Sequence, residues 1–282
     1  MLFPHRLRSI ALGVLLPLCG QAGLFDISVT FSDGMNESYK SAFSSAAAFW
    51  QSQITGYRID YAGLQGVTIT ANVAANDGVG GILGSAGPTE GTFFNGVPLA
   101  GDSGFSDVLY ATAGAMTFDS ADVDNLINAG LWEQVICHEM AHVIGFGTLW
   151  GFDYAGTIYN NFYAAGSGQY TGATGLAAYR AEFDPSATYV PVELGGGSGT
   201  SDGHWNEVDG GSALTGITNV LGNDMAFELM TGWLNSPTFV SSTTIAQFYD
   251  MGYNVIPEPS PVIMVVFVCA AAFWIRRRFP AY

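Results

Sequence analysis

The stretch LWEQVICHEMAHVIG, residues 131–145, predicts a helix that ends at its final glycine. His138 and His142 lie four positions apart, so a helix places them on the same face, one turn above each other. Both side chains can therefore offer an imidazole nitrogen to one metal ion. Glu139 lies about 100° further around the helix, beside such an ion rather than on it. A general base acting on zinc-activated water needs this position.

A catalytic zinc site needs a third protein ligand. The best-known continuation of this motif would place a histidine at position 148, which is Thr148 here. Outside the N-terminal segment the one remaining histidine is His204, which follows a long intervening segment. Asp153 and Glu182 are alternatives, because some zinc peptidases use an acidic third ligand. The residues around Asp153 and around Glu182, however, do not match the motifs of such peptidases well.

The composition indicates a compact and strongly acidic domain. The 282 residues are 49% hydrophobic, which excludes a disordered chain. Between residues 23 and 255, three basic residues stand against 23 acidic ones, a formal net charge of −20. Such a surface repels nucleic acid. Its carboxylates are potential calcium ligands, for example in GDSGFSD (101–107), although solvated loops have the same composition. Cys137 is the single cysteine of this part, so no internal disulfide can form.

The N-terminal residues 1–22 have a basic start, an apolar middle and small residues near Ala22. This order is typical of a secretory signal peptide, which is removed on export. A buried first helix and a lipoprotein signal at Cys19 are the alternatives. The signal peptide is the interpretation that best fits all three parts.

The C-terminal residues 256–282 also have three parts. Pro-Glu-Pro (257–259) precedes the apolar run 262–275, which three arginines follow. At 14 residues the run is short for a membrane span, which needs ~20 residues. The tail resembles the PEP-CTERM sorting signal of Gram-negative bacteria. That resemblance implies an exosortase-type sorting enzyme as a partner, transient anchoring in the inner membrane, and a final place at the cell surface or in the extracellular matrix. A plain membrane anchor is the alternative.

Apolar periodicity and turn residues predict a mixture of strands and helices, an α+β fold. The glycine-rich residues 75–106 predict a long loop with an edge strand near 91–97, and residues 146–203 an insertion with short elements. The remaining expected elements are strands at 24–31, 66–74 and within 108–118 (a strand pair, or a strand and a turn), and helices at 37–54, 119–130, 131–145 and before Gly252.

Three motifs together resemble one family. HEMAH with Gly145, then HW at 204–205 after an insertion, and later ELMTG at 228–232 resemble the leishmanolysin-type metzincin peptidases, which are zinc metalloendopeptidases. The similarity extends over about residues 108–255. It implies Zn²⁺ as the metal, with the roles of the residues as follows: His138, His142 and His204 as ligands, Glu139 as base, Gly145 as the turn, and Met230 as the Met-turn residue beneath the metal, with Met225 as the alternative.

The resemblance also implies an architecture. It predicts a metzincin-like zincin in which residues 23–255 form the peptidase domain, with a mixed N-terminal sheet, an active-site helix, the insertion at 146–203 and a small C-terminal lobe. The substrate would lie in the cleft between the two lobes. Two features depart from the family. Its eukaryotic members are rich in disulfides, whereas this domain has a single cysteine. They also carry a long propeptide, whereas here the first strand is expected to begin near residue 24.

We therefore expect an exported zinc-dependent endopeptidase that hydrolyses peptide bonds of a protein or peptide substrate. The alternative is a non-catalytic surface or matrix protein with a structural zinc site. A structural site has a closed shell of four protein ligands and no need of a base such as Glu139.

Overall fold

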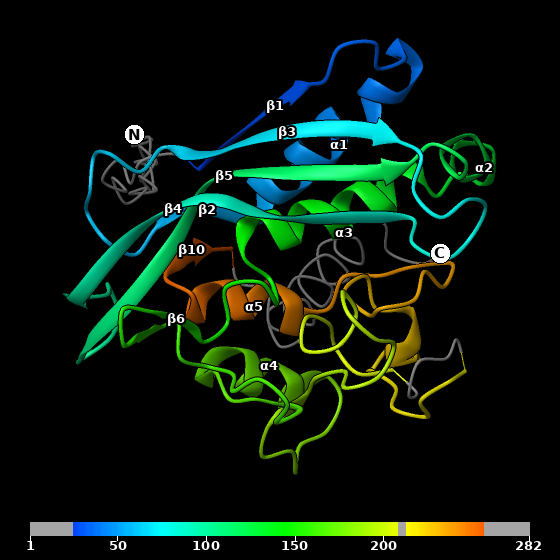
Figure 1. The fold of residues 1–282 in the computed structure, drawn as a ribbon. Helices are drawn as coiled ribbons and strands as arrows, with labels where there is room; N and C mark the ends of the chain where they lie inside the picture. The colour runs from blue at the N-terminus through cyan, green and yellow to red at the C-terminus, as the bar shows by residue number, and fades with distance from the viewer. Residues whose placement is uncertain (1–24, 208–212, 257–282) are drawn as a thin grey trace, which may run out of the picture.

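The computed structural model describes residues 25–207 and 213–256 (Figure 1). The expected signal peptide at 1–22 lies outside the described residues, and so does the sorting tail from residue 257 onward. None of the helices within the described ranges is long and apolar enough to pass through a bilayer.

The chain forms both strands and helices, which confirms an α+β fold with a mixed sheet. In chain order the elements are β1 (Asp26–Phe31), α1 (Glu37–Gln53), β2 (Ile54–Tyr57), β3 (Gly66–Ala74), β4 (Gly84–Pro98), β5 (Phe105–Asp119), α2 (Val123–Ala129), α3 (Trp132–Ile144), β6 (Phe152–Tyr154), β7 (Thr157–Tyr159), β8 (Gln169–Tyr170), α4 (Ala173–Glu182), β9 (Val190–Pro191), the 3-10 helix η1 (Met225–Phe227), α5 (Ser242–Asp250) and β10 (Tyr253–Val255).

The main sheet has four strands in the order β1-β3-β5-β4. β1, β3 and β5 run parallel, whereas β4 runs antiparallel to β5 at the sheet edge. In Figure 1 helices α1 and α3 lie on the same face of this sheet, with α4 and α5 further below. The expected helix 131–145 is therefore the central helix of the fold, packed between the sheet and the C-terminal part.

Helix α1 packs on α3 through one apolar face. Its residues Phe43, Ala46, Ala47 and Trp50 are buried, at the spacing expected of an amphipathic helix. The indole Nε1 of Trp50 donates a hydrogen bond of 2.9 Å to the carbonyl of Cys137 in α3. The α1 face thus fixes the position of the helix that carries the histidine motif.

The structure confirms the edge strand expected near 91–97 but corrects the long loop expected around it. Residues 84–98 form a single long strand, β4, which pairs with β5 over most of its length through several register shifts. β5 is likewise one strand rather than a strand pair. An edge strand is held by backbone hydrogen bonds to one neighbouring strand. A glycine-rich sequence can therefore form one without the alternation of polar and apolar side chains that predicts a strand. The short pair β2–β10 was not predicted at all, because its partners lie at opposite ends of the domain.

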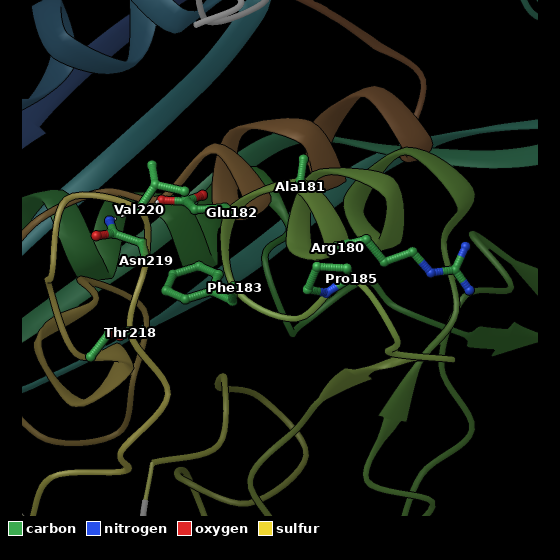
Figure 2. Close-up of a pocket in the computed structure, with 8 residues that line it drawn as sticks. All are labelled: Arg180, Ala181, Glu182, Phe183, Pro185, Thr218, Asn219 and Val220. Carbon is green, nitrogen blue, oxygen red and sulfur yellow. Dashed lines mark hydrogen bonds between the residues drawn. The ribbon is translucent and has the colours of Figure 1, made fainter.

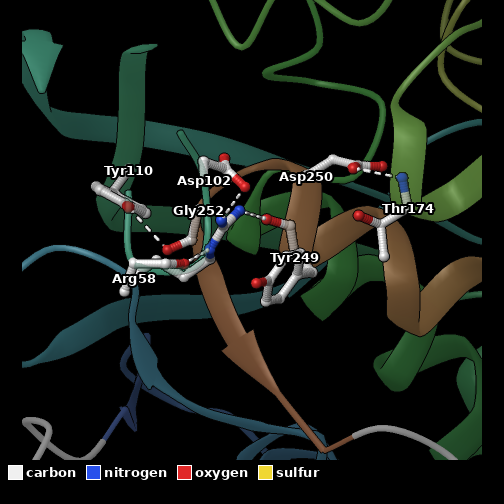
Figure 3. Close-up of polar contacts among 8 residues, drawn as sticks. Arg58, Asp102, Tyr110, Thr174, Tyr249, Asp250 and Gly252 are labelled. Atoms are coloured by element: carbon white, nitrogen blue, oxygen red, sulfur yellow. Dashed lines mark hydrogen bonds and ion pairs between the residues drawn. The ribbon is translucent and has the colours of Figure 1, made fainter. Parts of the chain in front are cut away.

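Arg58 joins the two ends of the domain (Figure 3). Its guanidinium donates to the carbonyls of Ala100 and Tyr249, both at 2.9 Å, and lies 2.6 Å from the carboxylate of Asp102. The side chain is buried, and the guanidinium carbon lies 3.7 Å from the ring centroid of Tyr249. A single cation therefore contacts two backbone carbonyls and one carboxylate from two other segments of the chain, 100–102 and 249.

We predict that Arg58→Ala lowers the free energy of unfolding by about 3 kcal/mol, because it leaves buried carbonyls without a donor. Urea unfolding at neutral pH measures the change. Lys40→Ala is the matched control, since Lys40 pairs with Glu37 at the surface, and it should shift stability by less than about 0.5 kcal/mol. Equal effects of the two substitutions would contradict this account of Arg58.

Candidate metal centre

Helix α3 presents His138 and His142 on one face and ends at Gly145, as the sequence predicts. Gly145 has φ 129°, and a Cβ there would lie 2.5 Å from the Met251 side chain, so the turn requires glycine. Thr148 donates from its hydroxyl to the carbonyl of His142 at 2.7 Å. Thr148, at the position where the best-known motif has its third histidine, thus stabilises the end of the motif helix.

His204 reaches the motif through a close contact between two backbone segments. Gly147 has φ 70°, and a Cβ on it would lie 2.2 Å from the carbonyl oxygen of Gly203. Only glycine permits this approach. Next to it, the ring of Trp205 stacks on that of Trp150 at 5.0 Å. The far end of the insertion is in this way held against its beginning.

The three predicted histidines converge on one point. Their Nε2 atoms form a triangle in which each pair is 3.0 Å apart. Across the described ranges, this is the one group of three or more histidine, cysteine or acidic side chains close enough to share a metal ion. The sequence prediction that His138, His142 and His204 come together is therefore correct.

The second nitrogen of each ring fixes its protonation. The Nδ1 atoms lie at hydrogen-bond distance from three backbone carbonyls, those of Leu229 (2.7 Å), Phe146 (2.8 Å) and Thr200 (2.8 Å). A carbonyl only accepts, so each Nδ1 carries the proton, and each neutral ring turns a bare Nε2 lone pair toward the other two. Three such lone pairs repel one another unless a cation lies among them. These separations leave room for an ion at the usual zinc–imidazole distance of about 2.0–2.1 Å from each nitrogen.

Burial keeps these rings neutral. It lowers the pKa of His138 and of His142, and it lowers the pKa of His204 to about 3. The neighbouring rings act in the same direction on His142 and His204. Neutral imidazole is the form that binds metals, so the cluster can hold a metal ion at physiological pH.

Glu139 lies beside the triangle and lines a cavity of about 730 Å³ that the three histidines also line. Burial raises the pKa of its carboxyl to about 8. A Cβ on Gly84 of β4 would lie 2.8 Å from Glu139 Oε1, so the edge strand can approach this carboxylate only through a glycine. The cavity lies between β4, α3 and the C-terminal segments around 198–204 and 229–234.

A buried carboxylate that sequence reasoning missed organises the segment below the histidines. Glu228 is almost fully buried and accepts hydrogen bonds from the Met230 amide (2.6 Å), the Ser241 amide (2.9 Å) and the Thr244 hydroxyl (2.6 Å). These hydrogen bonds hold the turn at 228–231, in which the Leu229 carbonyl lies at hydrogen-bond distance from His138 Nδ1. The one signal for this role in the sequence is that Glu228 lies inside the apolar run AFELM. An exposed glutamate would give the same pattern.

Neither rival for the third ligand joins the cluster. Asp153 is exposed on β6. Glu182 accepts from the Ser242 amide at 2.8 Å and from Asn219 at 3.3 Å. It lines a separate cavity of about 160 Å³ beside Asn219 (Figure 2), which shares no residue with the histidine cavity. Glu182 thus anchors the start of α5.

Cys137 and the acidic loop 101–107 lie outside the metal centre. Burial raises the pKa of the Cys137 thiol to about 12, so it stays protonated and is no ligand. In the loop 101–107, whose carboxylates the sequence left as calcium ligands or solvated side chains, Asp102 pairs with Arg58, and Asp107 accepts from the Gly96 amide at 2.8 Å. These two carboxylates therefore serve separate contacts rather than a shared ion.

Comparison of the chain with protein-family models, with curated proteins and with solved structures gives no significant match.

We predict that His204→Ala lowers the affinity of the cluster for a divalent metal at least about 100-fold, since changes behind the ligands alone reduce affinity about 10–100-fold. Metal content after dialysis, measured by mass spectrometry, reports the loss. Asp153→Asn is the control and should retain the metal. Retention by His204→Ala together with loss by Asp153→Asn would identify Asp153 as the third ligand instead.

Proposed function

We propose that this chain is an exported zinc-dependent endopeptidase of the leishmanolysin type. One observation carries the proposal: three neutral imidazole nitrogens converge beside the buried carboxyl of Glu139, in a cavity large enough for a peptide segment. With three protein ligands, one position is left for water or substrate, as in catalytic zinc sites. A structural site would close its shell with a fourth protein ligand, and the cluster has three.

His138, His142 and His204 would hold the zinc ion, which supplies Lewis acidity to water and to the scissile carbonyl. Glu139 accepts the proton of the attacking water on a carboxylate oxygen. It holds this proton as a neutral acid, a form that its buried position favours. It then donates the proton to the nitrogen of the departing amine.

The place of the cavity supports a substrate cleft between an N-terminal and a C-terminal part. Residues 81–86 line one side, and residues 229–234 line another. Met230 fits the Met-turn role better than Met225, since the adjacent Leu229 carbonyl bonds His138 and the Met230 carbonyl accepts from the Trp205 amide at 3.0 Å. These contacts favour the metzincin arrangement for this α+β fold.

Export rests on sequence features alone. The signal-like residues 1–22 and the tail at 257–282 support passage across the inner membrane, transient anchoring and sorting by an exosortase-type enzyme. The acidic domain is compatible with a location outside the cytoplasm. With a single cysteine it cannot gain stability from an internal disulfide, so its stability would come from the hydrophobic core and bound ions.

We predict that Glu139→Gln reduces peptide hydrolysis by at least about 100-fold, the usual contribution of a positioned general base. Casein cleavage by the zinc-loaded protein measures the rate, and metal content shows that the histidine site stays filled. Glu133→Gln removes an exposed carboxylate from the same helix and should leave the rate unchanged. Cleavage by Glu139→Gln at the wild-type rate would disprove the assigned mechanism.

A further inference from the structure

Two buried carboxylates behind the histidine cluster lack the partners that buried charges need. Glu193 is completely buried and Glu207 nearly so. One oxygen of each is bonded to a backbone amide, Glu193 Oε1 to Gly195 and Glu207 Oε2 to Gly232. Among the described residues nothing donates to the other oxygens, Glu193 Oε2 and Glu207 Oε1. A buried carboxylate without compensation is strongly unfavourable.

The two side chains come from backbone segments that are joined to each other. Val192 and Trp205 form an antiparallel bridge, and the Glu193 amide donates to the His204 carbonyl at 2.9 Å. The charge of Glu193 also acts on its partner: burial first, and then this charge, raises the pKa of Glu207 to about 7. The carboxylates are thus electrostatically coupled, like charges held in one buried region.

No basic side chain of the described residues neutralises this pair. The three candidates are engaged elsewhere: Lys40 with Glu37, Arg58 with Asp102, and Arg180 with the carbonyl of Ala187. In a domain with so few cations, the missing countercharge has to come from solution.

We propose that Glu193 and Glu207 bind a calcium ion. The ion would hold the glycine-rich loop between these two residues, 194–206, against the turn at Gly232. Ca²⁺ takes roughly six to eight oxygen ligands in adaptable geometry. The two unbonded carboxylate oxygens supply the charged ones, and loop carbonyls and water complete the shell. Mg²⁺ suits the place less well, because it demands octahedral geometry and gives up its water reluctantly.

Such an ion would act on the histidine cluster through Thr200. The carbonyl of Thr200 accepts from His204 Nδ1, and its side chain lies against Gly232, where a Cβ would be 2.3 Å from it and 3.3 Å from Glu207 Oε1. Fixing the loop therefore fixes the group that orients His204. The calcium proposal does not depend on the proposed peptidase function, because neither carboxylate lines the 730 Å³ cavity.

The test is thermal unfolding of the full chain, with its histidine site first loaded with stoichiometric zinc, as calcium is added. At a calcium concentration about a hundredfold above its Kd, the midpoint should rise by roughly 5–10 °C. Magnesium at the same concentration should produce a smaller rise. Terbium luminescence excited through tryptophan, displaced by calcium, gives a second measurement of the same binding.

Glu193→Gln and Glu207→Gln keep the shape of the side chains and should each abolish the calcium-dependent rise while zinc content stays unchanged. Asp153→Asn removes an equal charge from an exposed position and should keep the rise. If calcium leaves the wild-type midpoint unchanged, the pair shares a proton instead and the proposal is wrong. If both glutamine variants keep the rise, calcium binds elsewhere, and the proposal is equally wrong.

Discussion

Three imidazole nitrogens that face one another at 3.0 Å impose the main constraint on this molecule. Each ring is held in place by a carbonyl from a different segment, so helix α3, the loop at 193–203 and the turn at 228–231 must all meet at this point. The arrangement is repulsive without a cation. Binding of a metal ion at this cluster would therefore be coupled to the assembly of the C-terminal part on α3.

Buried carboxylates hold the segments that supply those carbonyls. Glu228 binds the turn and the start of α5 through neutral donors only. Asp250 does the same for α4, by accepting from the Thr174 and Gly175 amides and the Tyr170 hydroxyl (Figure 3 shows Asp250 with Thr174). Glu193 and Glu207 are different, because each keeps one oxygen without a donor. This contrast, together with the coupling of the two charges, is why a calcium ion is proposed at that pair and not at Glu228 or Asp250.

Glycine residues allow the close approaches on which the site depends. Gly84 lets the edge strand pass beside Glu139, and Gly147 lets the motif loop touch the backbone at Gly203. A side chain at Gly147 would push apart two backbone segments, and one at Gly84 would displace the Glu139 carboxylate. The high glycine content thus reflects contacts between backbone segments in addition to flexible loops.

The sequence by itself determined the motif helix, its stop at Gly145, the first strands and α1, and the candidate residues His138, Glu139 and His142, because these depend on spacing within one helix or strand. The scarcity of histidine also pointed to His204. Only the tertiary structure decided that His204 and not Asp153 or Glu182 meets the pair, that the edge strand expected near 91–97 extends over residues 84–98, and that Glu228, Glu193 and Glu207 are buried. These features arise from contacts between segments far apart in the chain, and local patterns carry no record of such contacts.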